Sequence, residues 1–148
     1  MSSARLKDKL ARFARLDGAD KWLMLRAVWW LAVARIMLLV MPFRRLAARL
    51  SAENSPRGAQ PDQVPLRRIS YAVSAAANNV PWRSDCFPQT IAARMMLKRQ
   101  GYSSTIHIGV ERVGEEGLAG HAWLTCGETV VTGGTELDRY TELHSLSE

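Results

Sequence analysis

The sequence has few cysteines: Cys86 and Cys126 are the only two in 148 residues. Two cysteines allow at most one disulfide, whereas small secreted domains usually depend on several. The first 21 residues are not expected to form a signal peptide, because basic residues are scattered among the apolar ones and no cleavage site follows an apolar run. Both features predict a protein of the reducing cytoplasm.

The sequence also lacks an uninterrupted apolar run of membrane-spanning length. The longest apolar stretch, from Trp22 to Phe43, contains Arg26 and Arg35. About 20 apolar residues are needed to cross a bilayer, and each Arg near its centre costs about 2.5 to 3.5 kcal/mol. We therefore expect a helix that is buried, or that rests on a membrane or a partner, and not a membrane span.

Negative charge is scarce in the first half of the chain. Residues 1–70 carry 14 Lys or Arg against 5 Asp or Glu, a net +9, whereas residues 71–148 carry 6 against 9, a net −3. Such a basic half could attract nucleic acid, an anionic lipid surface or an acidic peptide. Nucleic acid is disfavoured, because the pattern of aromatic and glycine residues typical of common RNA modules is missing.

Apolar spacing predicts helices in the first two thirds of the chain. A first amphipathic helix contains Leu6, Leu10 and Phe13, and Asp17 or Asp20 can cap the helix that follows. Pro42 is expected to kink or end that second helix. The predicted helical ranges after the first are 20–41, 43–50, 66–78 and 87–100, with a loop at 51–63.

Strands are expected only after Gly101. A β-branched run predicts one at 105–110, and a hairpin is expected from 119–125 and 128–132, with Cys126 and Gly127 in the turn. Helices first and strands last indicate an α+β fold. We divide it into an N-terminal helical region, 1–63, and a core, 64–148, within one folding unit.

Cys86 and His121 are the candidates for chemistry. Cys86 immediately precedes a predicted helix, whose N-terminus would stabilise a thiolate, although most free cysteines are simply small buried residues. His121 lies on a predicted strand, and an imidazole can take a thiol proton and later protonate a leaving amine. We expect ordinary, satisfied roles for His107 and His144, and a structural or incidental one for Cys126.

The tryptophans fall into two groups. Trp82 and Trp123 flank the candidate pair in sequence and could wall a cleft around it. Trp22, Trp29 and Trp30 lie at helical spacing, so they are expected to face the core or a partner.

These motifs resemble the B2 proteins of lasso-peptide biosynthesis, which are small transglutaminase-like members of the papain-type cysteine protease superfamily. The resemblance is carried by VPWRSDCFPQTIAARMMLKRQGY, TIHIGVER, GHAWL leading into VVTGG, and the earlier WLMLRAVWWLAVARIMLLV. It implies a papain/transglutaminase-like core with its catalytic Cys at a helix N-terminus, packed on a small antiparallel sheet.

The resemblance also implies an activity, that of a leader peptidase. Such an enzyme hydrolyses the leader–core bond of a ribosomally made precursor, with Cys86 as nucleophile, His121 as base and no cofactor or metal. Because the chain begins with helices and shows no early strands, a separate leader-binding protein is implied, which recognises the leader by strand addition. An ATP-dependent macrolactam cyclase is the other implied partner.

The third catalytic group departs from the family pattern. The family often has an Asp about twelve residues after the His, and Gly133 occupies that position here. Asp138 is our first choice for a side chain that orients the imidazole, with Thr132, Glu136 or a backbone carbonyl as alternatives.

Two other functions remain open from the sequence. The chain could be a non-catalytic adaptor that docks a partner or a membrane through its basic helical half. It could also transfer an acyl group to an amine, because hydrolysis and transfer pass through the same acyl-enzyme.

Overall fold

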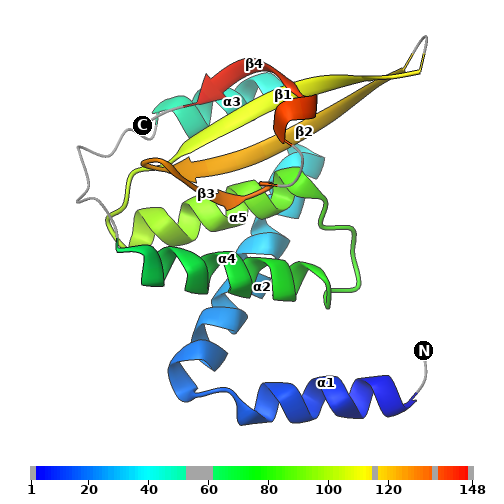
Figure 1. Ribbon diagram of the computed structural model, residues 1–148, viewed down its shortest axis with the longest axis vertical. Coiled ribbons are helices and arrows are strands. Elements are labelled where there is room, and N and C mark those ends of the chain that lie inside the picture. The colour runs from blue at the N-terminus through cyan, green and yellow to red at the C-terminus, as the bar shows by residue number, and fades with distance from the viewer. Residues whose placement is uncertain (1–2, 53–61, 115–116, 135–136, 147–148) are drawn as a thin grey trace.

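The computed structural model describes residues 3–52, 62–114, 117–134 and 137–146. Within these ranges, five helices lie on one side of a small four-stranded antiparallel sheet (Figure 1). The helices are α1 (Ser3–Arg15), α2 (Gly18–Val40), α3 (Phe43–Ala52), α4 (Gln63–Ala77) and α5 (Cys86–Arg99). The strands are β1 (Thr105–Val113), β2 (Gly117–Cys126), β3 (Thr129–Thr132) and β4 (Thr141–Leu146), with the short 3-10 helix η1 (Leu137–Arg139) before β4. The predicted α+β class is confirmed.

Local sequence signals set both ends of α2. The Asp17 side chain accepts a hydrogen bond of 2.5 Å from the backbone N–H of Ala19, as expected for an N-cap. At the other end, Met41 is extended, with φ −119° and ψ 127°. The ring of Pro42 disfavours a helical residue before it, so α2 ends there and α3 begins after the proline.

The hydrophobic core lies between the helices and the sheet. From α2 it takes Ala27, Leu31 and Ala34, all fully buried. Deep in α5, the fully buried Arg94 donates from Nη2 to the carbonyl oxygen of Leu50 at 2.5 Å, which satisfies a backbone group near the end of α3. A single core therefore includes residues from both sides of position 63. The division of the chain into a helical region, 1–63, and a core region, 64–148, stays a prediction.

The sheet has the strand order β3-β2-β1-β4. Leu124 and Cys126 of β2 belong to the core, and the alternation of a strand places His121 and Trp123 on its opposite face. The predicted hairpin turn was one residue too early. Cys126 is the last residue of β2 and pairs with Thr129, because Gly127 supplies the positive φ of 59° that the turn requires.

The sequence analysis expected no strand after residue 132 and therefore missed β4. The strand pairs antiparallel with β1 along the edge of the sheet, with a register shift between Ile108 and Gly109. Its residues are mostly polar, so no apolar alternation indicated a strand. Backbone pairing to a preformed neighbour decides its conformation, which is a tertiary effect.

Candidate active site

Cys86 is the first residue of α5, and its side chain is partly exposed. The preceding Asp85 has the extended backbone of an N-cap, but its side chain makes no capping bond and lies 3.6 Å from Nε of Arg83 instead. The first turn of α5 contains no acidic residue. The thiol therefore lies at a helix N-terminus whose uncapped N–H groups favour negative charge.

Thr90, one helical turn later, joins the start of α5 to the sheet. Its hydroxyl oxygen lies 2.8 Å from the carbonyl oxygen of Cys86 and 3.3 Å from that of Ala122. It is also 3.4 Å from the hydroxyl oxygen of Thr132 at the end of β3. Thr90 is completely buried, so this contact is part of the core. The structure thus brings the first turn of α5 against the strand residue that follows His121.

The imidazole of His121 is held by a backbone carbonyl and two aromatic rings. Its Nε2 donates to the carbonyl oxygen of Gly133 at 2.7 Å. The ring stacks on Tyr140, with centroids 4.6 Å apart, and more distantly on Trp123 at 6.1 Å. A carbonyl can only accept, so Nε2 carries the hydrogen and the neutral ring keeps its free lone pair on Nδ1. Nδ1 is the atom that can take a proton from a thiol.

Gly133 cannot be replaced by a larger residue without moving the chain. Its φ is +72°, and an added Cβ would lie 2.5 Å from the carbonyl oxygen of Ala122 and 3.0 Å from Cα of Trp123. This backbone therefore excludes an Asp at position 133. Among the alternatives left open by the sequence, a backbone carbonyl is the group found against His121.

Asp138 and Thr132, two of the other proposed third members, make no hydrogen bond to the imidazole among the residues that the structure describes. Asp138 lies exposed in η1, and the described residues show no hydrogen bond between it and His121. Thr132 is turned towards Thr90. Glu136 lies outside the described residues.

Cys86 and His121 are not joined by a hydrogen bond anywhere in the part of the chain that the structure describes. In substrate-free enzymes, catalytic hydrogen bonds are often long and shorten only when substrate binds. The structure thus holds a thiol at the N-terminus of α5 and an imidazole of fixed tautomer on β2, and these two elements meet through Thr90 and the backbone of Ala122.

His107 has the ordinary role expected for it. Its Nδ1 lies 2.7 Å from a carboxylate oxygen of Glu142, and its Nε2 lies 2.9 Å from the hydroxyl of Thr125. Its ring stacks on Trp123, with centroids 5.2 Å apart and an interplanar angle of 8°. Trp123 thus lies between the two histidine rings, on the face of the sheet away from the core.

Two polar atoms just ahead of Cys86 are buried. Nε1 of Trp82 and Oγ of Ser84 have no hydrogen-bond partner among the described residues. Leaving a buried donor unpaired costs about 1–3 kcal/mol. The amide of Gln89 donates to the carbonyl of Ser84 at 2.7 Å, which ties this segment to α5.

Sequence reasoning left a backbone carbonyl open as the group that orients His121 but did not identify it as that of Gly133, and it did not identify Tyr140 as a stacking partner. The Gly-Gly pair after a predicted strand is a visible sign of unusual backbone, but nothing in it shows where a carbonyl points. Tyr140 depends on η1 and β4, which the sequence did not indicate.

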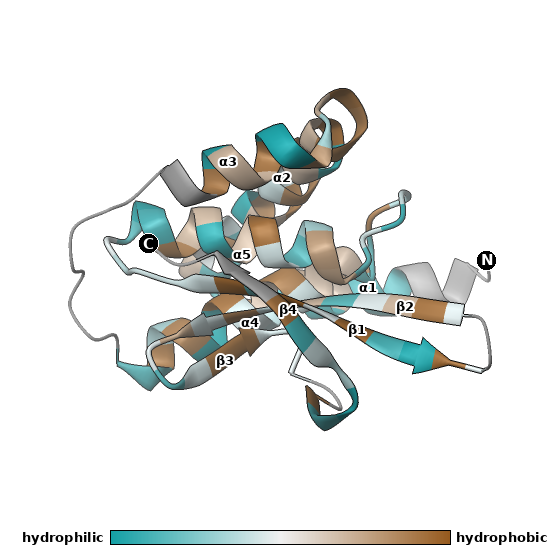
Figure 2. Ribbon diagram, turned by 90° about the horizontal axis from the view of Figure 1, so that it is seen from above, coloured by the Kyte–Doolittle hydropathy of each residue, from teal (hydrophilic) through white to brown (hydrophobic). Residues whose placement is uncertain are grey.

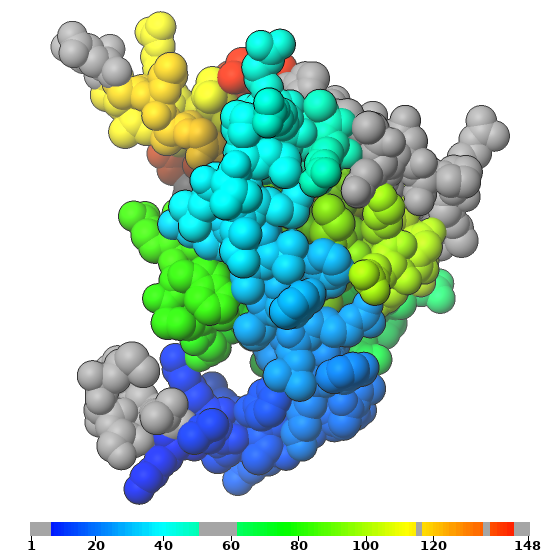
Figure 3. Space-filling view, turned by 180° about the vertical axis from the view of Figure 1, so that it is seen from behind, coloured from blue at the N-terminus to red at the C-terminus, as the bar shows by residue number. Residues whose placement is uncertain are grey.

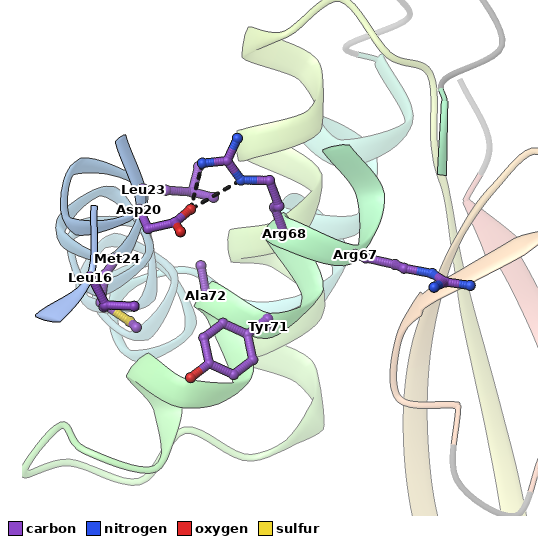
Figure 4. Close-up of a pocket in the computed structure, with 8 residues that line it drawn as sticks. All are labelled: Leu16, Asp20, Leu23, Met24, Arg67, Arg68, Tyr71 and Ala72. Atoms are coloured by element: carbon purple, nitrogen blue, oxygen red, sulfur yellow. Dashed lines mark hydrogen bonds and ion pairs between the residues drawn. The ribbon is translucent and has the colours of Figure 1, made fainter. Parts of the chain in front are cut away.

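A separate pocket of about 200 Å³ lies between the start of α2 and α4 (Figure 4). At its edge, Arg68 binds Asp20, and the hydrogen bond and negative charge of Asp20 raise the pKa of Arg68. Figure 4 shows Tyr71 at the opposite side, and the remaining walls are Leu16, Leu23, Met24, Arg67 and Ala72. The pocket has no nucleophile, and the described ranges contain no cluster of three His, Cys, Asp or Glu that could hold a metal.

Comparison with known proteins identifies one family. A family model for the transglutaminase-like superfamily matches residues 28–145, a range that begins within α2 and includes Cys86, His121 and Gly133. No curated protein and no solved structure matches the chain.

Proposed function

The chain belongs to the transglutaminase-like superfamily, and we propose on this basis that it is a cysteine protease that removes the leader of a lasso-peptide precursor. Members of the superfamily are commonly cysteine peptidases or transglutaminases. The finer assignment rests on the resemblance of the Cys86 and His121 segments to the B2 leader peptidases. The structural observation that supports the proposal is the hydrogen bond from Nε2 of His121 to the carbonyl oxygen of Gly133, because it fixes the tautomer of the imidazole.

In the proposed reaction, Nδ1 of His121 takes the proton of the Cys86 thiol. The thiolate attacks the scissile carbonyl carbon, and the imidazolium then protonates the departing amine, which leaves an acyl-enzyme. A water molecule gives its proton to Nδ1 and attacks the thioester, so the leader leaves with a new carboxylate and the free thiol is restored.

Gly133 takes over part of the role of the family's acidic residue. A carbonyl and a carboxylate both fix the tautomer, because both accept from Nε2–H. A neutral carbonyl stabilises the imidazolium less than a carboxylate would. We therefore expect slower turnover than in relatives that keep the acid.

The proposed partners are a separate leader-binding protein and an ATP-dependent macrolactam cyclase in the cytoplasm. Tethering raises the local concentration of a substrate, so purified chain should cleave precursor slowly alone and faster with the leader-binding protein. Equal, sequence-specific cleavage with and without that protein would show that this chain recognises the leader itself.

The direct test is Cys86→Ala, assayed by mass spectrometry on precursor with the leader-binding protein present. Cleavage should be lost, because the bond-forming atom is missing, while the fold persists because a helix N-terminus tolerates Ala. Cys126→Ala is the matched control. Cys126 is buried and its Sγ donates to the carbonyl of Ser103, so we expect normal cleavage with a stability lower by about 1 kcal/mol.

Hydrolysis and acyl transfer are separated by the product. Cleavage in the presence of a primary amine gives a free leader carboxylate if water resolves the acyl-enzyme and a leader amide if the amine does. Predominant amide formation would reassign the activity to transfer while keeping the same residues.

A non-catalytic adaptor is the second candidate, and the exposed apolar side of α2 favours it. An adaptor predicts that Cys86→Ala leaves precursor maturation unchanged in the complete system. A rate of precursor maturation in the complete system that stays within about tenfold when that variant replaces the unmodified chain would favour the adaptor.

A further inference from the structure

α2 is apolar on two opposite sides, and only one of them is covered. Ala27, Leu31 and Ala34 face the core and are fully buried. At 100° per residue, the opposite side carries large apolar residues that are 52% to 73% exposed. We call this side, with the first residue of α3, the outer face: Trp22, Leu25, Trp29, Ile36, Leu39, Val40 and Phe43.

The outer face is long and continuous. From Trp22 to Val40 the helix runs about 27 Å, at 1.5 Å per residue. Figure 3 shows α2 lying uncovered along the back of the molecule from α1 to α3, and Figure 2 shows hydrophobic residues at the junction of α2 and α3. Contiguous exposed apolar surface of this kind marks an interaction site, unlike scattered single residues.

The surroundings of the outer face are basic. Asp20 is the only acid in residues 18–52, and Arg68 neutralises it, whereas the same range carries Lys21, Arg26, Arg35, Arg44, Arg45 and Arg49. Arg26 and Arg99 line an open groove together with Trp22, Trp29 and Trp30, and the Arg99 guanidinium lies 5.3 Å from the Trp30 ring centroid. Indole rings beside guanidinium groups are the combination that binds the interface of an anionic bilayer.

We propose that the outer face docks the protein on an anionic phospholipid membrane, with α2 lying along the surface. By length and composition alone α2 could cross a bilayer, and only 17% of its most apolar window is buried in the protein. Crossing would remove Ala27, Leu31 and Ala34 from the core, whereas lying flat uses only the exposed side. Like charges around Arg26 and Arg35 disfavour pairing with a second copy of the chain.

This placement brings the membrane close to the candidate active site. Phe43, at the end of the outer face, contacts Phe87, the residue after Cys86, with ring centroids 5.7 Å apart. The docking itself does not depend on the proposed peptidase activity. Only the statement that the membrane lies close to an active site rests on that proposed function.

The test is co-sedimentation of the full chain with vesicles of phosphatidylcholine alone or of an equal mixture with phosphatidylglycerol. We expect binding only to the anionic vesicles, weaker at high salt, with a blue shift of tryptophan fluorescence. Trp22→Gln with Trp29→Gln should lower the partition coefficient by at least about tenfold. Arg26→Gln with Arg99→Gln should lower it by about fivefold for each charge removed.

Leu118→Gln is the matched control, because Leu118 is equally exposed but lies on β2, far along the sequence from the outer face. Circular dichroism checks that each variant is folded. Absence of binding to anionic vesicles, or equal losses for the tryptophan pair and Leu118→Gln, would overturn the proposal. So would a dimer in solution, or a complex with the leader-binding protein, that the tryptophan pair abolishes while vesicle binding is absent.

Discussion

The outer face of α2 and the His121 end of β2 are built in opposite ways. The outer face consists of large apolar side chains that touch little, and its character follows from residue types alone. At the other region, a single imidazole is fixed by one backbone oxygen and two stacked rings from three different segments. The apolar character of the first region is readable in the sequence, whereas its exposure is known only from the structure, and the second region exists only when the sheet has formed.

Two histidines on the same face of the sheet allow a direct test of the proposed base, because His107 and His121 both stack on Trp123. His121→Asn removes the proposed base, so we expect a loss of at least about 10⁴-fold in kcat for precursor cleavage. His107→Asn should leave kcat unchanged and lower thermal stability, because it loses contacts with Glu142 and Thr125. Equal losses of kcat for the two variants would mean that both histidines have only a structural role.

A glycine pair tests whether a backbone oxygen orients the imidazole. Gly133→Ala should lower kcat by about 100-fold, because the clash with Ala122 and Trp123 displaces the carbonyl. It should also cost about 1–3 kcal/mol of stability. Gly101→Ala has a similar φ of +81° but open space around the added Cβ, so it should lose stability alone. Unfolding midpoints and cleavage rates measured together separate the two effects.

Tyr140 is a weaker positioning residue. Tyr140→Leu keeps bulk but loses the stacked ring, and we expect kcat to fall by about three- to tenfold with little change in KM. Tyr140→Phe keeps the ring and should restore the rate. A loss for Tyr140→Phe equal to that of Tyr140→Leu would shift the role to the hydroxyl.

Asp138→Asn should have the smallest effect. A side chain that oriented His121 would cost about 10⁴-fold when lost, whereas an exposed one changes stability by about 0.5 kcal/mol or less. Because Gly133 already occupies Nε2, we expect near-normal cleavage and an unchanged unfolding midpoint. A large kinetic loss would show that Asp138 reaches the imidazole in the substrate complex, and would restore our first choice.

Much of the helical architecture was predictable from local signals. Asp17 caps α2, Pro42 ends it, and the predicted range 87–100 differs from α5 by one residue at each end. The strands were predictable where β-branched residues alternate, as in β1, and not where they are polar, as in β4. Between the two alternatives for Trp22 and Trp29, the core or a partner, the structure leaves both rings outside the core.

The amino-acid sequence was enough to predict the order of the five helices and the first three strands, the superfamily, and the placement of Cys86 before a helix and His121 on a strand. Tertiary structure alone decided that Thr90 joins their two elements, that Tyr140 covers the imidazole, and that Gly133 supplies the oxygen on Nε2. The physical reason is that every residue carries the same carbonyl group. Its direction depends on the path of the backbone, so residue identity at position 133 indicated only that a side chain was missing.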